Sequence, residues 1–271
     1  MNFRPPGLFP MFLLGPLLIF LLLVAPGIRL LMLARRSKQI PEFWGGLYFI
    51  GAAIGLAMRV LGSSLFLTQP ELANTLNTIG HLTFASGTIA MTIFTLRVFH
   101  PGSSRARIFS GVTIAAILLT TAHTLLAGFT NIENSYSMVA TNFSRLIPTC
   151  WAFLESCRYW RSMRRRETLG LADPILTNRF LLWSIWTGTV SILPMIALVL
   201  RTLSIVTLGN SEFAEGQGAA LMPMVLQMIR VAFVIIIPIA AVALSLSFFP
   251  PAAYLDRVRE RAEAAPTGAP A

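Results

Sequence analysis

Long apolar runs separated by short polar segments occupy most of this 271-residue chain. Crossing the hydrocarbon core of a bilayer takes about 20 mostly apolar residues, and in lipid a helix satisfies its own backbone polar groups. The runs therefore predict an all-α polytopic membrane protein, a bundle of seven transmembrane helices within residues 1–250. We expect these helices near residues 8–34, 43–67, 72–96, 108–130, 136–158, 179–208 and 220–249.

The composition agrees with this fold class. Hydrophobic residues make up 55% of the chain and charged residues only 12%, which is about half the charged fraction of a typical soluble domain. In a soluble protein, the formal net charge of +10 would favour a nucleic-acid partner. Here the arginines fall mainly in short connections between apolar runs, so we expect a lipid bilayer and no nucleic acid as partner.

Alternate connections differ in charge, and this difference predicts the orientation. The first, third and fifth connections contain Arg35, Arg36, Lys38, Arg97, Arg105, Arg107, Arg158, Arg161, Arg164, Arg165, Arg166 and Arg179. The intervening segments 68–71, 131–135 and 209–218 contain no Lys or Arg. Because basic loops stay on the cytoplasmic side, we expect an inner (plasma) membrane protein with its N-terminus outside and its C-terminus in the cytoplasm.

The two terminal segments need separate interpretation. The first apolar run has the length and composition of a cleaved signal peptide, but cleavage would place Arg35, Arg36 and Lys38 outside, against every later connection. We therefore expect a retained first helix. Residues 251–271 are expected to form a short cytoplasmic tail that begins with a mixed-charge helix and ends in a disordered stretch.

Four of the predicted helices carry small or polar residues at alternating steps of three and four, which places them on one face. These residues are Gly51, Gly55, Arg59 and Ser63; Asn74, Thr78, His81, Ala85, Thr88, Thr92 and Thr95; Thr113, Ala116, Thr120, His123 and Ala127; and Asn142, Arg145, Thr149, Ala152 and Ser156. In lipid, small residues let helices approach closely and polar residues pair across helices. We call these four sets of residues polar stripes and expect them to line the interior of the bundle. Packing alone would explain the Thr, Ser, Ala and Gly positions.

Five ionisable side chains share one predicted depth. Arg59, His81, His123, Arg145 and Arg230 each lie about seven to ten residues, and so roughly 10 to 15 Å, from the outer end of their helices. The sequence has no Asp or Glu at that depth. Since a guanidinium does not lose its proton in a protein, backbone carbonyls, water or a bound anion must compensate the charge.

A bound anion is the most economical of these answers. It predicts a pocket in the outer half of the bundle for an anionic small molecule or lipid headgroup, in a receptor-like sensor, scaffold or transport role. The ligand-binding residues would be Arg59, His81, His123, Asn142, Arg145, Gln227 and Arg230. The alternative is a membrane cytochrome in which His81 and His123 ligate the iron of haem b.

Enzyme chemistry finds little support in the motifs. Lys38, the only lysine, lies in the first connection, which excludes a retinal Schiff base. No zinc-protease helix, phosphate-binding loop or nucleophile elbow occurs in the sequence. We therefore expect no catalytic residue and no bound metal ion.

The fifth connection is the most basic part of the chain. Its residues Arg161, Arg164, Arg165 and Arg166 are expected to contact anionic lipids or an acidic cytoplasmic protein partner. Their alternative role is only to hold this connection on the cytoplasmic side.

Overall fold

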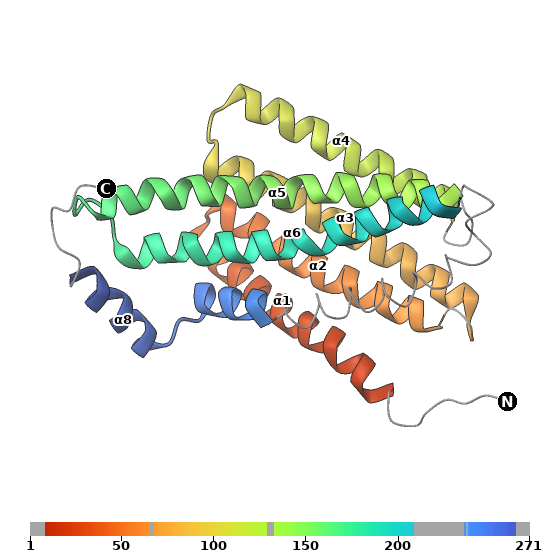
Figure 1. Cartoon of the computed structure of the whole chain (residues 1–271), viewed down its shortest axis with the longest axis horizontal. Helices are drawn as coiled ribbons and strands as arrows, with labels where there is room; N and C mark the ends of the chain where they lie inside the picture. Colours follow the sequence, from red (N-terminus) through yellow and green to blue (C-terminus); the bar gives the residue numbers. More distant parts are fainter. Residues whose placement is uncertain (1–8, 66–67, 129–132, 209–235, 237, 264–271) are drawn as a thin grey trace. The chain divides into compact units, whose positions relative to one another are not determined.

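The computed structural model describes residues 9–65, 68–128, 133–208, 236 and 238–263, which form helices joined by short turns (Figure 1). The helices are α1 (Phe9–Ser37), α2 (Ile40–Leu65), α3 (Pro70–Phe99), α4 (Ser104–Ala127), α5 (Glu133–Glu167), α6 (Pro174–Leu208) and α8 (Ala252–Glu263). A further helix covers Pro238–Phe248. The described ranges contain no strand, so the predicted all-α class is confirmed.

Within the described residues, four helices are long and apolar enough to cross a membrane, namely α2, α3, α4 and the part of α6 from Pro174 to Ile196. A fifth crossing requires the helix Pro238–Phe248 and the first part of α8 to be counted together, although they meet at an angle of 85°. The chain is therefore apolar enough for a multi-pass membrane protein. The count of seven spans and the sides on which the termini lie stay predictions.

The remaining predicted spans have different outcomes. The spans near 8–34 and 136–158 fall within α1 and α5, which are helical. α5 is not among the candidate spans because polar residues along its length lower its mean hydropathy. The span near 220–249 lies mostly outside the described residues.

The boundaries around the fifth connection differ from the prediction. α5 continues past residue 158 to Glu167, where the amide of Leu171 donates to the carbonyl of Arg166 at 2.8 Å and Gly170 adopts a φ of 70°. This is the hydrogen bond and left-handed glycine of a helix C-cap. α6 begins at Pro174 because Asp173 Oδ1 accepts from the amide of Ile175 at 2.9 Å. Most of the predicted loop is thus helix.

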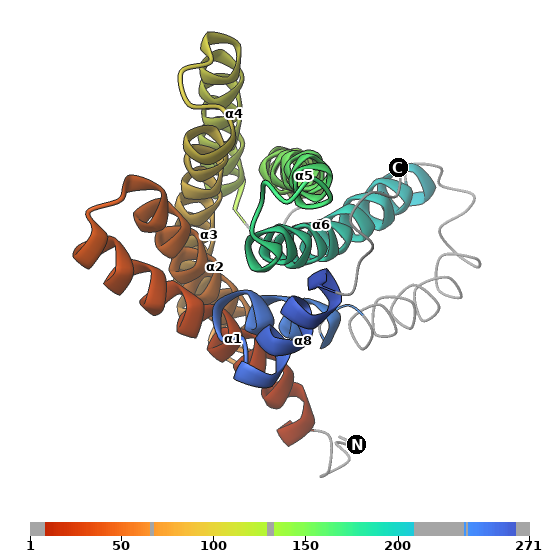
Figure 2. The same ribbon diagram turned by 90° about the vertical axis from the view of Figure 1, so that its left-hand side faces the viewer.

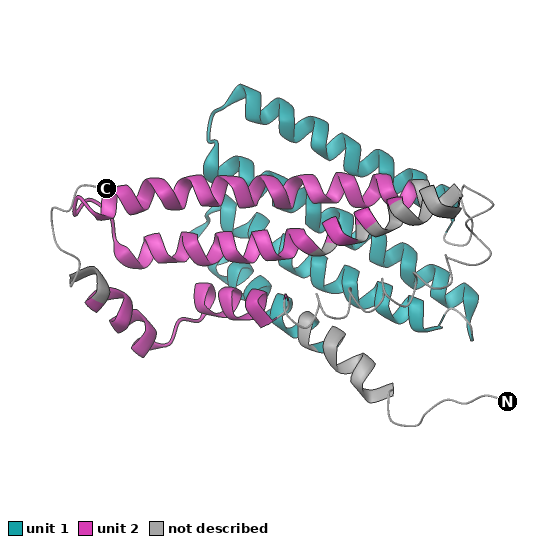
Figure 3. Cartoon of the chain, viewed as in Figure 1, with its two compact units in different colours: residues 1–134 teal, residues 135–271 magenta. Residues whose placement is uncertain are grey.

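The chain divides into two compact units, residues 1–134 and 135–271 (Figure 3). In the first unit α2 packs against both α1 and α3, and α4 packs against α3. A Cβ built on Gly51 of α2 would lie 2.8 Å from the Cα of Gly87 in α3, and one on Gly55 would lie 2.7 Å from the Cβ of Phe84. The close approach predicted at Gly51 and Gly55 is therefore confirmed.

The second unit is built around α5 and α6, which lie side by side in both views (Figures 1 and 2). The rings of Tyr159 and Phe180 pack with centroids 4.6 Å apart. Toward the C-terminus, Asn178 Nδ2 donates to the hydroxyl of Tyr254 at 2.7 Å. This bond holds α8 against the start of α6, so the α5–α6 turn and α8 share one end of the unit.

Candidate functional site

The polar stripe of α3 lies mainly on its buried face. Five of its seven residues are buried, whereas Asn74 is exposed and Thr78 is half-buried. The buried members are His81, Ala85, Thr88, Thr92 and Thr95. The predicted inward orientation of this stripe is therefore confirmed for its second half.

The buried hydroxyls of this stripe bond within α3. Thr88 donates to the carbonyl of Phe84 at 2.8 Å, Thr92 to that of Thr88 at 3.0 Å, and Thr95 to that of Met91 at 2.9 Å. These three bonds lie within one helix and do not pair α3 with a neighbour, because a threonine hydroxyl in a helix reaches the carbonyl one turn back. Packing is the better explanation of these threonines.

Arg59 and His81, two residues of the predicted cationic layer, belong to the two helices of the α2–α3 crossing. Gly80 of α3 faces Arg59, and a Cβ built on it would lie 2.7 Å from Arg59 Cγ and 3.0 Å from the Arg59 amide nitrogen. The missing side chain at Gly80 thus makes room for the aliphatic part of Arg59, which is half-buried. His81 follows Gly80 in α3 and is only 2% exposed.

His123 has a different environment. It lies on the exposed surface of α4, whereas His81 is buried in α3. Bis-histidine ligation of haem requires both imidazoles to point at one iron. The contrast in burial gives the haem alternative no support, and it stays a prediction.

The second unit contains Arg145, the most buried arginine of the predicted layer among the described residues. Arg145 of α5 is 4% exposed, and Asn142 one turn earlier is half-buried. Thr149 and Ser156 on the same face donate to carbonyls of their own helix, at 2.9 and 2.6 Å. Arg145 therefore differs from its hydroxyl neighbours, because carrying a guanidinium into a buried site costs far more than carrying a hydroxyl.

The layer as a whole stays a prediction. Arg59, His81 and His123 belong to the first unit, and Asn142 and Arg145 to the second. Gln227 and Arg230 lie outside the described residues. Of the four ionisable members that the structure describes, burial supports two, Arg145 and His81.

The arginines predicted to contact lipid or a partner all lie on the C-terminal extension of α5. Arg161, Arg164, Arg165 and Arg166 are exposed, and the guanidinium of Arg164 lies 5.8 Å from the centroid of the Trp160 ring. They form a helical row rather than a loop. Sequence reasoning missed this, although the first glycine after the arginines, Gly170, marked the helix end.

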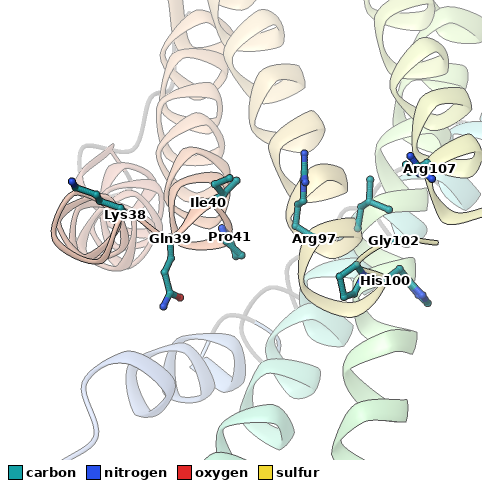
Figure 4. Close-up of a pocket in the computed structure, with 10 residues that line it drawn as sticks. Lys38, Gln39, Ile40, Pro41, Arg97, His100, Gly102 and Arg107 are labelled. Atoms are coloured by element: carbon teal, nitrogen blue, oxygen red, sulfur yellow. The ribbon is translucent and has the colours of Figure 1, made fainter. Parts of the chain in front are cut away.

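A hollow of about 600 Å³ opens at one end of the first unit (Figure 4). Lys38 and Gln39 line it from the turn between α1 and α2, and Arg97, His100 and Arg107 line it from the segment around the turn between α3 and α4. None of the described residues that line it is acidic. Sequence reasoning interpreted these basic residues only as topology signals and did not predict a site.

Local hydrogen bonds fix both turns. After α1, Lys38 takes a φ of 56° and its amide donates to the carbonyl of Ala34 at 2.8 Å. After α3, Gly102 takes a φ of 89°, which an L-residue rarely adopts. Ser103 then caps α4 by accepting from the amide of Ala106 at 3.3 Å.

Comparison with protein-family models, curated proteins and solved structures finds no match to the chain. Among the described residues, no group of three or more His, Cys, Asp or Glu side chains is arranged to hold a metal ion. The function must therefore be argued from the placement of the chain's own charged residues.

Proposed function

We propose that the chain is a seven-span plasma-membrane protein that binds an anionic small molecule or lipid headgroup near the buried Arg145, in a receptor-like, scaffold or transport role. The observation that carries this proposal is Arg145, a permanently charged side chain that is 4% exposed on α5. Ionisable residues inside membrane proteins are costly and usually functional. An anion bound beside Arg145 would offset that cost.

Arg59 provides secondary support. Its stem packs over Gly80 in the first unit, and the buried His81 is the next residue of α3. A guanidinium offers several donors in a fixed plane, which suits carboxylate or phosphate oxygens. The proposed ligand is therefore anionic rather than cationic or neutral.

The ligand test compares two arginines of one helix. The full chain would be purified in mild detergent, and the molecules that co-purify would be identified by mass spectrometry. The wild type and an Arg158→Gln control should retain an anion, because Arg158 is exposed and lies outside the four arginines proposed to contact lipid. Arg145→Gln should lose it. An equal amount of that anion on Arg145→Gln, or none on the wild type, would overturn the proposal.

The proposed orientation places the basic connections in the cytoplasm. Residues of the first and third connections line one hollow of the first unit. In the second unit, the Asn178–Tyr254 bond brings α8, with Arg257 and Arg259, to the end where α5 and α6 connect. This grouping within each unit favours one cytoplasmic face.

Cysteine labelling tests the orientation directly. After replacement of Cys150 and Cys157, single cysteines would be placed at Gln69 or Ser104, which are exposed and lie beyond opposite ends of α3. A membrane-impermeant maleimide should label intact cells at residue 69 and should label residue 104 only after permeabilisation. The reverse pattern would invert the proposed topology.

The basic extension of α5 is proposed to contact anionic lipid or an acidic cytoplasmic protein. Its four arginines are exposed within about two helical turns. Such clusters beside a membrane are attracted to anionic headgroups. Exchange of all four for glutamine should release a cytoplasmic partner or reduce binding to vesicles that contain phosphatidylserine.

A further inference from the structure

We infer that the hollow at the end of the first unit is a second anion site, one that binds the phosphate group of a membrane lipid at the bilayer surface. Its residues belong to the first unit, whereas Arg145 belongs to the second. It lies between the α1–α2 and α3–α4 turns, and Figure 4 shows Lys38 at one side, Arg107 at the other, and Arg97 and His100 between them.

Charge gives the class of ligand. Lys38, Arg97 and Arg107 contribute three formal positive charges, and the described lining contains no carboxylate. The nearby acid, Glu42, accepts a hydrogen bond from the hydroxyl of Ser37 and does not line the hollow. Arginine and lysine side chains are the usual donors to phosphate oxygens.

One of these donors is held in position by its own helix. Arg107 Nη2 donates to Ser104 Oγ at 3.0 Å, and the Arg107 amide donates to the carbonyl of Ser103 at 3.1 Å. A guanidinium held by one hydrogen bond retains other donors for an anion. The turn between α3 and α4 therefore presents Arg107 with less loss of side-chain freedom than a free surface arginine.

Size and apolar lining favour a lipid over free phosphate. A volume of about 600 Å³ is in the usual range for small organic ligands. Ile40, Pro41 and Leu96 supply apolar surface beside the cations, and Ile40 is 54% exposed. Because α2, α3 and α4 are each long enough to cross a bilayer, the turns at their ends lie at headgroup level. A phosphate ester with an attached glycerol would meet both kinds of surface.

The experiment uses the full chain in detergent with three probes: dioctanoyl phosphatidic acid, inorganic phosphate and dioctanoyl phosphatidylcholine. Thermal unfolding is followed as each probe is titrated. The wild type should be stabilised by phosphatidic acid at concentrations at which the other two have little effect. Stabilisation by inorganic phosphate at the same concentrations would overturn the lipid assignment and identify a site for free phosphate.

Variants test whether the hollow itself is the site. Loss of one Lys or Arg near a membrane surface is expected to weaken anion binding by about fivefold. The double variant Arg97→Gln, Arg107→Gln should therefore weaken the binding of phosphatidic acid about 25-fold. The matched control is Arg105→Gln, an exposed arginine in the first turn of α4 that does not line the hollow. It should change the affinity by less than about twofold. If the double variant and the control lost equal affinity for phosphatidic acid, the binding would depend only on general surface charge, and the proposal would be overturned.

A steric variant keeps the charge constant. Ile40→Trp fills part of the hollow without altering any cation. It should therefore weaken the binding of phosphatidic acid, whereas Arg105→Gln should not. Unfolding temperatures without probe show that each variant is folded. An Ile40→Trp chain that is folded and binds phosphatidic acid as the wild type does would place the lipid elsewhere and overturn the proposal.

Discussion

The α2–α3 crossing of the first unit and the α5–α6 crossing of the second both use glycine, but the glycines meet different surfaces. A Cβ on Gly51 would lie 2.8 and 2.9 Å from backbone atoms of Gly87. A Cβ on Gly188 would lie 2.7 Å from Cε2 of the Phe153 ring. Backbone cannot move aside without displacing a helix, whereas a ring can rotate or shift. The first crossing is therefore the less tolerant one.

The polar stripes of the two units differ in a related way. Buried hydroxyls of α3, such as that of Thr92, bond to carbonyls of the same helix. On α5, the hydroxyl of Ser156 does the same, but the buried face also contains the guanidinium of Arg145. Polar residues with similar spacing thus form a packed surface in α3 and include a buried charge in α5.

The largest effect is expected for Gly51→Ala. The added methyl group would overlap the backbone of α3, so we expect a loss of about 3 kcal/mol or more in the free energy of unfolding. Gly111→Ala is the control, because a Cβ at Gly111 meets no atom within 4 Å. It should instead stabilise α4 by about 0.5–1 kcal/mol. Unfolding in mixed micelles would measure both, and a harmless Gly51→Ala would contradict the close crossing.

Arg145→Leu should have a smaller effect on stability than Gly51→Ala. The substitution removes the desolvation cost of a buried charge, but it also removes the contacts that the guanidinium makes. Because these two effects oppose each other, we expect the free energy of unfolding to change by less than about 2 kcal/mol, together with loss of the co-purifying anion. The same unfolding assay on ligand-free protein checks this value. A loss as large as that of Gly51→Ala would show that Arg145 has a structural role and would remove the contrast with α3.

Gly188→Ala sharpens the comparison of the two crossings. Because the methyl group meets a side chain, the expected loss is about 1–2 kcal/mol. Shortening the ring partner by Phe153→Leu should recover part of that loss in the double variant. A double-mutant cycle measures the coupling. Additive losses would show that the two residues do not share the space between α5 and α6.

Sequence alone predicted the features that depend on lipid and on helical periodicity. The apolar runs predicted helices, and the steps of four at Gly51 and Gly55 predicted a close crossing that the structure contains. Periodicity also placed the buried face of α3. These features follow from residue type and spacing within one helix, and no knowledge of distant contacts is needed.

Features that depend on turns and capping were missed. The extension of α5 to Glu167 follows from the cap at Gly170, but hydropathy ends the apolar run near residue 158. The hollow depends on Lys38 having a positive φ, which is unusual for lysine, and on two turns that are far apart in sequence. Average hydropathy contains no information on either. The cationic layer combines residues of both units, which spacing within single helices cannot bring together.

The smallest effect is expected for Thr92→Val, and it tests the packing interpretation of α3 most directly. The Thr92 hydroxyl donates to the carbonyl of Thr88, an acceptor that the helix backbone also uses. Its removal leaves no backbone group unsatisfied, and valine fills nearly the same volume. We therefore expect the free energy of unfolding to change by less than about 0.5 kcal/mol. A loss above about 1.5 kcal/mol would mean that the hydroxyl also serves another helix, and the stripes of α3 and α5 would then be equivalent.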